Sequence, residues 1–472
     1  MKFISTREGS PSLNFEDTIM QGLAVDGGLY VPDFLPQFDK GQIDRMRKLS
    51  YQDLFFEVTK CFIDGEISDK DYKQIIQKSY ATFNHKAIAP LKQISDRDYL
   101  LELFHGPTLA FKDFALQFIG NVFEHFLAKR DEKIVIIGAT SGDTGSAAIH
   151  GCMRCDHAQI FILHPYERVS EIQRKQMTTI ENANVCNIAI KGNFDDCQNM
   201  VKKMFAMEAA GDKFLKGKKM VAVNSINFAR IMAQIVYYFY SALRLGVSET
   251  NTISFSVPTG NFGDIYAGFL AKRMGLNIGK LIIATNANDI LFRFITKNDY
   301  SREQLIETIS PSMNIQVSSN FERLLFDFYK GAKTKHSMAE LMSEFEKSGT
   351  LKVDQFILKE IQQDFTSFAA SDEITQKYVK EQFEGNDEII DPHTATGIYA
   401  AEQYAKTKDY KNEPIVTLAT AHPAKFPDAV VGSKVPHPKL PNFLEGLLEK
   451  EEKYDIIDND LESVVEYISN KI

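Results

Sequence analysis

Apolar and polar residues alternate in two repeating forms along the middle of the chain. Short runs of aliphatic residues bounded by turn residues predict buried strands. These runs are residues 99–104, 134–137, 159–163, 185–190, 220–223, 252–257, 281–284 and 414–420. Between them, apolar residues recur every three or four positions, which predicts helices. These helices cover 113–129, 144–155, 171–181, 194–210, 227–245 and 264–274. Such alternation is typical of a mainly parallel sheet covered by helices on both faces.

The flanking regions follow other patterns. Helical spacing of apolar residues covers 15–23, 51–64 and 68–83, and residues 24–32 read as a turn followed by a short strand. Residues 300–385 are charged and predicted to be more helical, and residues 389–397 form a loop that starts another helix. No internal repeat or long linker interrupts the 472 residues, a length that corresponds to roughly two to four domains.

Charge and composition exclude several classes of protein. The net charge of −9 argues against a general nucleic-acid binder, so an anionic substrate must be held by local donors. The N-terminus has no apolar signal-peptide core, and the apolar stretch 231–243 is interrupted by Gln234 and too short for a membrane span. Five cysteines in so long a chain suggest reduced thiols. We therefore expect a cytoplasmic protein that binds neither nucleic acid nor membrane.

Lys112 is the first candidate for chemistry, because it lies in the apolar segment 103–115. Gly106 and Pro107 bend the chain ahead of it. Burial among aromatic residues disfavours the ammonium form and lowers the lysine pKa. A neutral amine can act as a nucleophile or form a Schiff base. The alternative is a partly buried lysine whose ammonium reaches solvent at a helix start.

Two glycine-containing loops, each between a predicted strand and a helix, are candidate anion sites. The first is residues 138–146 (GATSGDTGS), and the second is residues 257–264 (VPTGNFGD). Small residues let the backbone approach a ligand, and a helix N-terminus offers unpaired N–H groups. The first loop has the spacing of neither a Walker A nor a dinucleotide motif. The alternative for the first loop is a turn capped by Ser141 or Asp143.

Further candidates are weaker. Thr420 lies at the carboxyl end of a predicted strand and could hydrogen-bond a ligand ring nitrogen, or serve only as a turn residue. Cys152 and Cys155 form a C-x-x-C pair without a second ligand pair at zinc-site spacing, so two helix thiols are favoured over a metal or redox site, and we predict no metal. No Gly-x-Ser-x-Gly nucleophile signature is present.

With these motifs in place, the chain resembles the threonine synthase family of pyridoxal-phosphate enzymes of fold type II, nearly end to end. The motifs that carry the resemblance are residues 26–32 (DGGLYVP), 104–113 (FHGPTLAFKD), 139–147 (ATSGDTGSA), 192–198 (GNFDDCQ), 224–227 (NSIN), 258–264 (PTGNFGD) and 420–426 (TAHPAKF). Phe228 departs from the family, which has a tryptophan there, but keeps an aromatic ring.

The resemblance implies an α/β fold like that of the tryptophan synthase β subunit, with two open parallel-sheet lobes and an N-terminal extension. The extension would cover residues 1–90. The smaller lobe, with Lys112 and the first loop, would cover 91–245, and the larger lobe, with the second loop and Thr420, would cover 246–472. The resemblance also suggests a monomer or a homodimer.

Residue roles follow from the same resemblance. Lys112 would form a Schiff base with pyridoxal 5′-phosphate, and Thr420 would face the pyridine nitrogen. The cofactor phosphate would be held by Gly260, Asn261, Phe262 and Asp264, mostly through backbone N–H groups. The amino-acid end of the substrate would be bound by Ser141, Gly142, Asp143 and Thr144.

The implied reaction converts O-phospho-L-homoserine and water to L-threonine and phosphate. A phospholyase that releases 2-oxobutyrate, a serine/threonine dehydratase and a non-catalytic binding protein of the same fold are the alternatives. The intact Lys112 and phosphate loop disfavour the non-catalytic protein, and the missing glycine spacing disfavours a nicotinamide-dependent dehydrogenase. The residues that bind the substrate phosphate stay unassigned, with cations Arg168, Arg174, Lys175 and Arg230 as candidates by charge.

Overall fold

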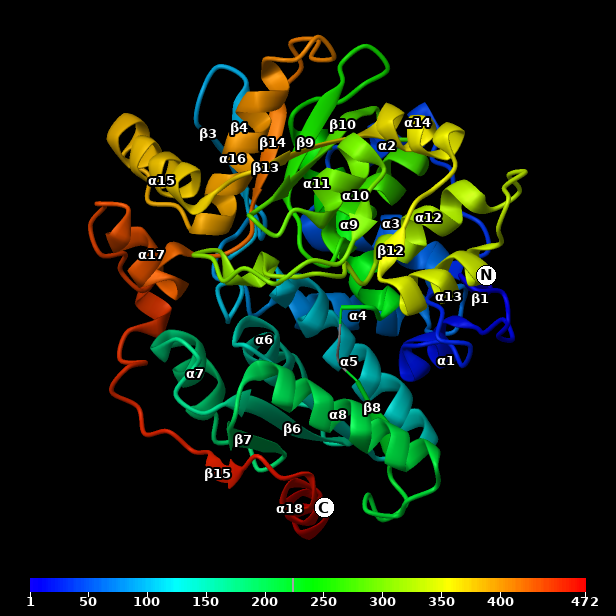
Figure 1. Ribbon diagram of the computed structural model, residues 1–472, viewed down its shortest axis with the longest axis vertical. Helices are drawn as coiled ribbons and strands as arrows, with labels where there is room; N and C mark the ends of the chain where they lie inside the picture. Colours follow the sequence, from blue (N-terminus) through cyan, green and yellow to red (C-terminus); the bar gives the residue numbers. More distant parts are fainter. Residues whose placement is uncertain (223–224) are drawn as a thin grey trace.

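Two twisted β-sheets, one above the other in Figure 1, organise the chain. The computed structural model describes residues 1–222 and 225–472. One sheet has six strands in the order β13-β10-β9-β14-β4-β3, and the other has five in the order β15-β7-β6-β5-β8. We call the first sheet with its helices the large lobe and the second the small lobe. The predicted α/β class with two parallel-sheet lobes is confirmed.

The small lobe has an all-parallel sheet. Its strands are β5 (Ile134–Ala139), β6 (Ala158–Pro165), β7 (Val185–Lys191), β8 (Lys219–Val221) and β15 (Asp455–Asp458). Its helices are α6 (Asp143–Cys152), α7 (Glu171–Thr178), α8 (Phe194–Ala209) and α18 (Leu461–Lys471). The central strands β5 and β6 are nearly continuous apolar runs, as expected for strands covered on both faces.

The large lobe is parallel except for its edge strand β3, which runs antiparallel to β4. Its strands are β3 (Leu91–Gln93), β4 (Asp98–Glu102), β9 (Ile253–Pro258), β10 (Ile278–Thr285), β13 (Phe365–Ala369) and β14 (Ile415–Ala419). Its helices are α10 (Gly263–Arg273), α11 (Ile290–Lys297), α12 (Phe321–Tyr329), α13 (Met338–Ser348), α14 (Gln355–Asp364), α15 (Asp372–Asn386), α16 (Pro392–Ala405) and α17 (Pro427–Gly432). Short pieces β11 (Tyr300–Ser301), β12 (Thr350–Leu351), η1 (Pro311–Met313), η2 (Pro423–Lys425) and η3 (Asn442–Leu444) complete it.

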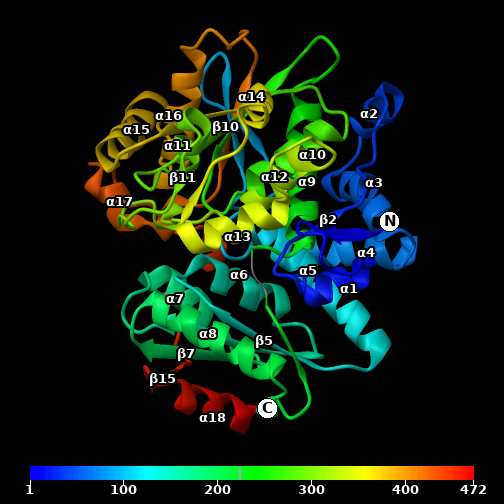
Figure 2. The ribbon, with the colours of Figure 1, turned by 45° about the vertical axis from the view of Figure 1, so that its right-hand side comes forward.

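The N-terminal region packs beside two long buried helices, α5 (Lys112–Arg130) and α9 (Phe228–Arg244). Figure 2 shows it against α9 and α5, on the right-hand side. It contains β1 (Phe3–Ser5), α1 (Phe15–Gln21), β2 (Tyr30–Pro32), α2 (Lys40–Met46), α3 (Tyr51–Ile63) and α4 (Asp69–Tyr80). Residues Phe228 to Leu243 of α9 are all buried, which confirms the prediction of a buried helix. Among the described residues, no helix is long and apolar enough to cross a membrane.

Sheet membership does not follow the predicted lobe boundaries at residues 90/91 and 245/246. Strands β3 and β4 belong to the large lobe, because β4 pairs with β14. The last strand, β15, pairs with β7 of the small lobe, and Figure 1 shows the chain descending to it from α17. Strand β13, in a region predicted to be helical, extends the large sheet beyond β10. Val223 and Asn224, the ends of one predicted strand and one motif, lie outside the described residues.

Candidate active site

Lys112 lies where the end of strand β14 meets the start of helix α5. The segment before it pairs with the chain after β14, because the backbone N–H of Phe111 donates to the carbonyl oxygen of Thr420 over 2.9 Å and Ala110 bridges to Ala421. The Lys112 side chain is only 12% exposed. Burial is the main cause that lowers the pKa of Lys112, with the cations Lys425 and Arg230 acting in the same direction. The predicted desolvation of this lysine is confirmed.

Asp143 is the carboxylate beside Lys112, and it accepts hydrogen bonds on both oxygens. Lys112 Nζ lies 3.1 Å from Oδ2, which also accepts from the Ser312 hydroxyl over 3.0 Å. Oδ1 lies 2.8 Å from Lys425 Nζ and accepts from Gln173 Nε2 over 2.9 Å. Burial alone would raise the pKa of Asp143, but the charges of Lys112 and Lys425 hold it well below its ordinary value. Asp143 is therefore an anion shared by two lysines.

The second glycine loop has the backbone of an anion site. It runs from the end of β9 into α10, whose N-terminus has no side-chain cap, and Phe262 there adopts a left-handed φ of 63°. The backbone N–H groups from Gly260 to Asp264 find no acceptor among the described residues. Unpaired donors at a helix N-terminus bind phosphate groups. The Asp264 carboxylate does not point to these donors, since it accepts from the hydroxyls of Tyr237 and Tyr238 over 2.5 and 2.9 Å.

The first glycine loop opens helix α6 in the same way. Its N-cap Gly142 has a φ of 142° and no side-chain cap. Thr140 Oγ1 accepts from the N–H groups of Gly142 and Gly145, which fixes the turn, while the N–H groups of Ser141, Asp143 and Thr144 have no acceptor in the described chain. The loop thus presents backbone donors to an anion, whereas the Asp143 side chain faces the lysines.

Of the four cations predicted as candidates for binding the substrate phosphate, Arg230 differs from the others in its burial and its partners. Arg174 pairs with Glu452 over 2.9 Å, Lys175 donates to the carbonyl oxygen of Lys450, and Arg168 is exposed. Arg230 is 5% exposed, yet its Nη1 has no hydrogen-bond partner among the described residues. Burial lowers its pKa to about 10. A buried guanidinium nitrogen without a partner is costly, which makes Arg230 the best candidate among these four for binding an anionic ligand.

Three side chains of the site were not predicted, namely Gln173, Ser312 and Lys425. Lys425 belongs to the motif 420–426, but the sequence did not indicate a function for it. No sequence motif pointed to Ser312 or Gln173. Ser312 is positioned by a buried relay, since its N–H donates to His393 Nε2 over 3.1 Å and His393 Nδ1 contacts Asp391 over 2.7 Å. Distant chain segments thus converge on Asp143.

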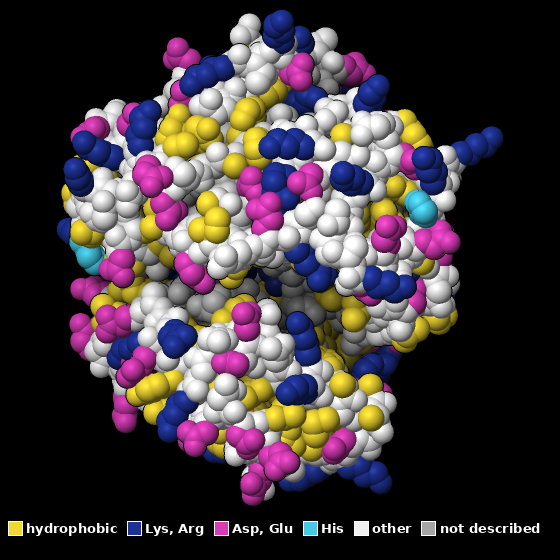
Figure 3. All heavy atoms as spheres, in the orientation of Figure 1, with side chains coloured by type: hydrophobic (Ala, Val, Ile, Leu, Met, Phe, Trp, Pro, Cys, Tyr) yellow, Lys and Arg dark blue, Asp and Glu magenta, His cyan; other side chains and the backbone are white. Residues whose placement is uncertain are grey.

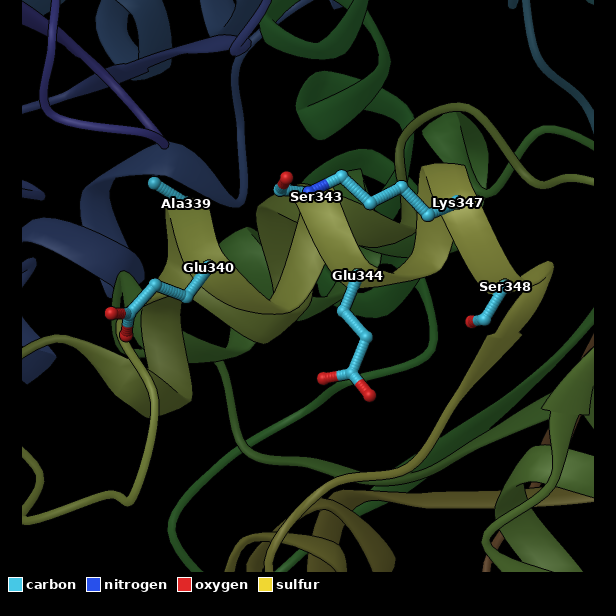
Figure 4. Close-up of a pocket in the computed structure, with 6 residues that line it drawn as sticks. All are labelled: Ala339, Glu340, Ser343, Glu344, Lys347 and Ser348. Carbon is cyan, nitrogen blue, oxygen red and sulfur yellow. The ribbon is translucent and has the colours of Figure 1, made fainter.

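Other features lie apart from this cluster. Cys152 and Cys155 are buried thiols, and burial raises the pKa of Cys152 to about 12. No group of three His, Cys, Asp or Glu side chains in the described chain could hold a metal ion. Figure 4 shows a surface hollow whose lining residues all belong to α13 (Ala339, Glu340, Ser343, Glu344, Lys347 and Ser348). It is one face of a single helix, whereas Figure 3 shows a deeper hollow between the two lobes.

These donors fit pyridoxal 5′-phosphate. A buried amine of lowered pKa suits an aldehyde, and the unpaired N–H groups of residues 260–264 suit the phosphate. At Gly260 an added Cβ would lie 2.9 Å from the Ser312 carbonyl oxygen. Any residue larger than glycine would therefore displace the loop. Thr420 is buried, and its carbonyl oxygen accepts from the Phe111 N–H, so it lies beside the Lys112 segment.

Comparisons with known proteins agree with this chemistry. The family model described as "Pyridoxal-phosphate dependent enzyme" matches residues 90–355, "Threonine synthase N terminus" matches 2–80, and "Threonine synthase, C-terminal" matches 394–468. Threonine synthase of Pseudomonas aeruginosa is 52% identical over 470 residues, covering 99% of this chain and 98% of that protein.

Solved structures give the same result. The fold is similar to the pyridoxal-phosphate-bound threonine synthase of Brucella melitensis, with a TM-score of 0.95 and 44% identity over 100% of this chain and 99% of that one. The yeast threonine synthase has a TM-score of 0.93 and 41% identity, covering 100% and 98%. Since sequence, fold and the donors around Lys112 agree, the chain belongs to the threonine synthase family of pyridoxal-phosphate-dependent enzymes.

Proposed function

We propose that this protein converts O-phospho-L-homoserine and water to L-threonine and phosphate, as the last step of threonine biosynthesis. The observation that carries the proposal is the combination of the buried Lys112 amine with a separate buried cation, Arg230, whose Nη1 has no hydrogen-bond partner among the described residues. The amine and the loop at 260–264 serve the cofactor. Arg230 is then available for a second anion, the phosphate of the substrate.

Separate groups of residues would bind the cofactor and the substrate. Lys112 would bind pyridoxal 5′-phosphate through its amine, residues 260–264 would bind the cofactor phosphate, and the Thr420 hydroxyl would hydrogen-bond its pyridine nitrogen. When bound, the cofactor supplies an electron-withdrawing ring that acidifies protons near the substrate amino group. The unpaired N–H groups of Ser141, Asp143 and Thr144 bind the substrate carboxylate.

Lys112 also moves protons. With substrate bound beside it, Lys112 Nζ would accept the proton from the substrate Cα, which the bound cofactor would acidify. A proton then leaves Cβ, and phosphate leaves Cγ toward Arg230. A proton returns to Cγ, water adds its oxygen at Cβ, and Lys112 returns a proton to Cα. The remaining proton leaves with the phosphate, so that substrate and water become threonine and phosphate. The hydroxyl of Thr420, unlike a carboxylate, would not favour a protonated pyridine ring, which we infer limits the lifetime of a carbanion at the substrate Cα.

The alternative is a phospholyase that performs the same elimination and releases 2-oxobutyrate. The test is to incubate cofactor-loaded protein with O-phospho-L-homoserine and to quantify phosphate, threonine and 2-oxobutyrate. Threonine equal to phosphate supports the synthase. Phosphate with 2-oxobutyrate would favour the phospholyase, and no phosphate would contradict both. We also propose a cytosolic monomer, although a homodimer is compatible with the same chemistry.

A further inference from the structure

Lys425 is a fully buried lysine at the interface of the two lobes. It lies in η2, directly after the turn that follows β14, and its side chain is 0% exposed. Its ammonium has three acceptors: Asp143 Oδ1 at 2.8 Å, the carbonyl oxygen of Thr108 at 2.6 Å and Gln176 Oε1 at 3.1 Å. An ammonium has three protons, so Lys425 has no donor left for substrate. Its partners lie in the Lys112 segment, in α6 and in α7.

We propose that Lys425 is a positioning residue that acts through Asp143, holding this carboxylate ionised and in place beside the reactive nitrogen of Lys112. The inference rests on the proposed role of Lys112 as the cofactor lysine. It assigns a role to a side chain of the large lobe that contacts neither the amine of Lys112 nor the glycine loop at 260–264.

The division of donors between the two oxygens of Asp143 supports this role. Lys112 and Ser312 contact Oδ2, whereas Lys425 and Gln173 contact Oδ1. When Lys112 reacts with the cofactor, its ammonium is lost as a partner of Oδ2. The contacts on Oδ1 are unaffected by that reaction. Asp143 therefore keeps a cationic partner, without which a buried carboxylate would take up a proton.

The charged groups around Lys112 fix the direction of the effect. They are Asp143 from α6, Lys425 from η2 and Arg230 from α9. Without Lys425, one cation that disfavours the Lys112 ammonium is lost, and Asp143 is left to pair with Lys112 alone. Both changes favour protonated Lys112. The other titratable groups near Lys425 are Asp113, His150 and His422. Both histidines have a pKa lowered to about 4 by burial and stay neutral near pH 7.

The experiment measures the rate at which full-length, cofactor-free protein forms a Schiff base with pyridoxal 5′-phosphate, followed by visible absorbance across a pH series. The midpoint of the rate profile reports when Lys112 loses its proton. We expect Lys425→Met to move the midpoint up by about one pH unit, so that the rate near neutral pH falls about tenfold. Lys425→Arg, which keeps the charge, is expected to stay near the wild-type midpoint.

Lys175→Met is the matched control, because Lys175 is another buried lysine of this region whose ammonium contacts the Lys450 carbonyl oxygen and Glu452 instead of Asp143. Its midpoint should be that of the wild type. Should Lys425→Met fail to fold by circular dichroism, Lys425→Gln provides the same loss of charge in a polar side chain.

A double-mutant cycle separates action through Asp143 from a direct effect of charge. In an Asp143→Asn background, Lys425→Met should move the midpoint by a third of its single-variant shift or less. A full shift in that background, or an unchanged midpoint in a folded Lys425→Met protein, would overturn the inference while leaving the proposed function standing. If the wild type formed no Schiff base at Lys112, both would fail.

Discussion

The backbone N–H of Phe111 donates a 2.9 Å hydrogen bond to the carbonyl oxygen of Thr420. This bond joins the residue before the reactive lysine to the end of a central strand of the large lobe. The hydroxyl of Thr420 and the amine of Lys112 are therefore held on adjacent segments. A ligand that contacts both side chains is bound by parts of the chain that are more than 300 residues apart.

Replacing Lys112 tests the centre of the proposal. Lys112→Met should abolish the visible absorbance of the bound cofactor and reduce phosphate release at least about a thousandfold, because no other amine replaces its nucleophile and base. The fold should persist, since the buried Lys112 side chain is exchanged for an apolar one of similar size. Lys86→Met, at an exposed position, is the control. Normal turnover by Lys112→Met would contradict the assignment.

Replacing Arg230 tests the site for the substrate phosphate. Arg230→Met should raise KM for O-phospho-L-homoserine by about 10- to 100-fold, the loss expected for hydrogen bonds to a charged group. Stability without substrate should stay equal or increase, because a buried cation whose Nη1 has no partner among the described residues is removed from the interior.

Arg174→Met is the contrasting variant for Arg230. It breaks a guanidinium pair with Glu452, so it should lower the melting temperature and leave KM nearly unchanged. An unaltered KM in Arg230→Met would show that another group binds the substrate phosphate.

Replacing Gly260 tests the phosphate loop. The added methyl of Gly260→Ala would lie 2.9 Å from the Ser312 carbonyl oxygen, a backbone atom, so the loop must shift. Overpacking of this kind costs about 1–3 kcal/mol, and we expect the cofactor Kd to rise by about fivefold or more. At Gly385 in α15 nothing lies within 4 Å. Gly385→Ala should leave cofactor binding unchanged and, because Gly385 lies in the last turn of α15, stabilise the helix by at most about 0.5 kcal/mol. Equal cofactor affinity in both variants would exclude the loop as the phosphate site.

Buried histidines predict how stability depends on pH. Burial lowers the pKa of His164 from 6.5 to about 4, and neither ring nitrogen has a partner in the described chain. Between these two values the unfolded chain binds a proton that the folded protein does not. His164 therefore lowers the free energy of unfolding by about 1.4 kcal/mol for each pH unit of acidification in that range.

The measurement is urea unfolding between pH 7 and pH 4. His164→Phe should flatten the dependence by roughly that slope, whereas His336→Phe at an exposed position should not. The same slope in wild type and His164→Phe would show that this histidine is not buried neutral.

The sequence indicated which segments carry the chemistry but not how they meet. Lys112 and the loops could be predicted because an apolar setting and glycines before helices are local signals. Ser312 and Lys425 could not be predicted. Each contacts Asp143 from the other lobe, and no local sequence pattern indicates such a contact. Strand β13 was missed since its five residues lie between two helices. Strand β15 was missed because its acidic ends and its exposed position at the sheet edge leave no buried apolar run.

The late position of β14 in the chain has a consequence for synthesis on the ribosome. This strand lies between β9 and β4 in the large sheet, so β4 has no parallel partner until residues 415–419 have emerged. A nascent chain already contains Lys112 long before the surroundings that set its reactivity exist. The cofactor site is therefore complete, with Thr420 and Lys425 in place, only when translation is almost finished.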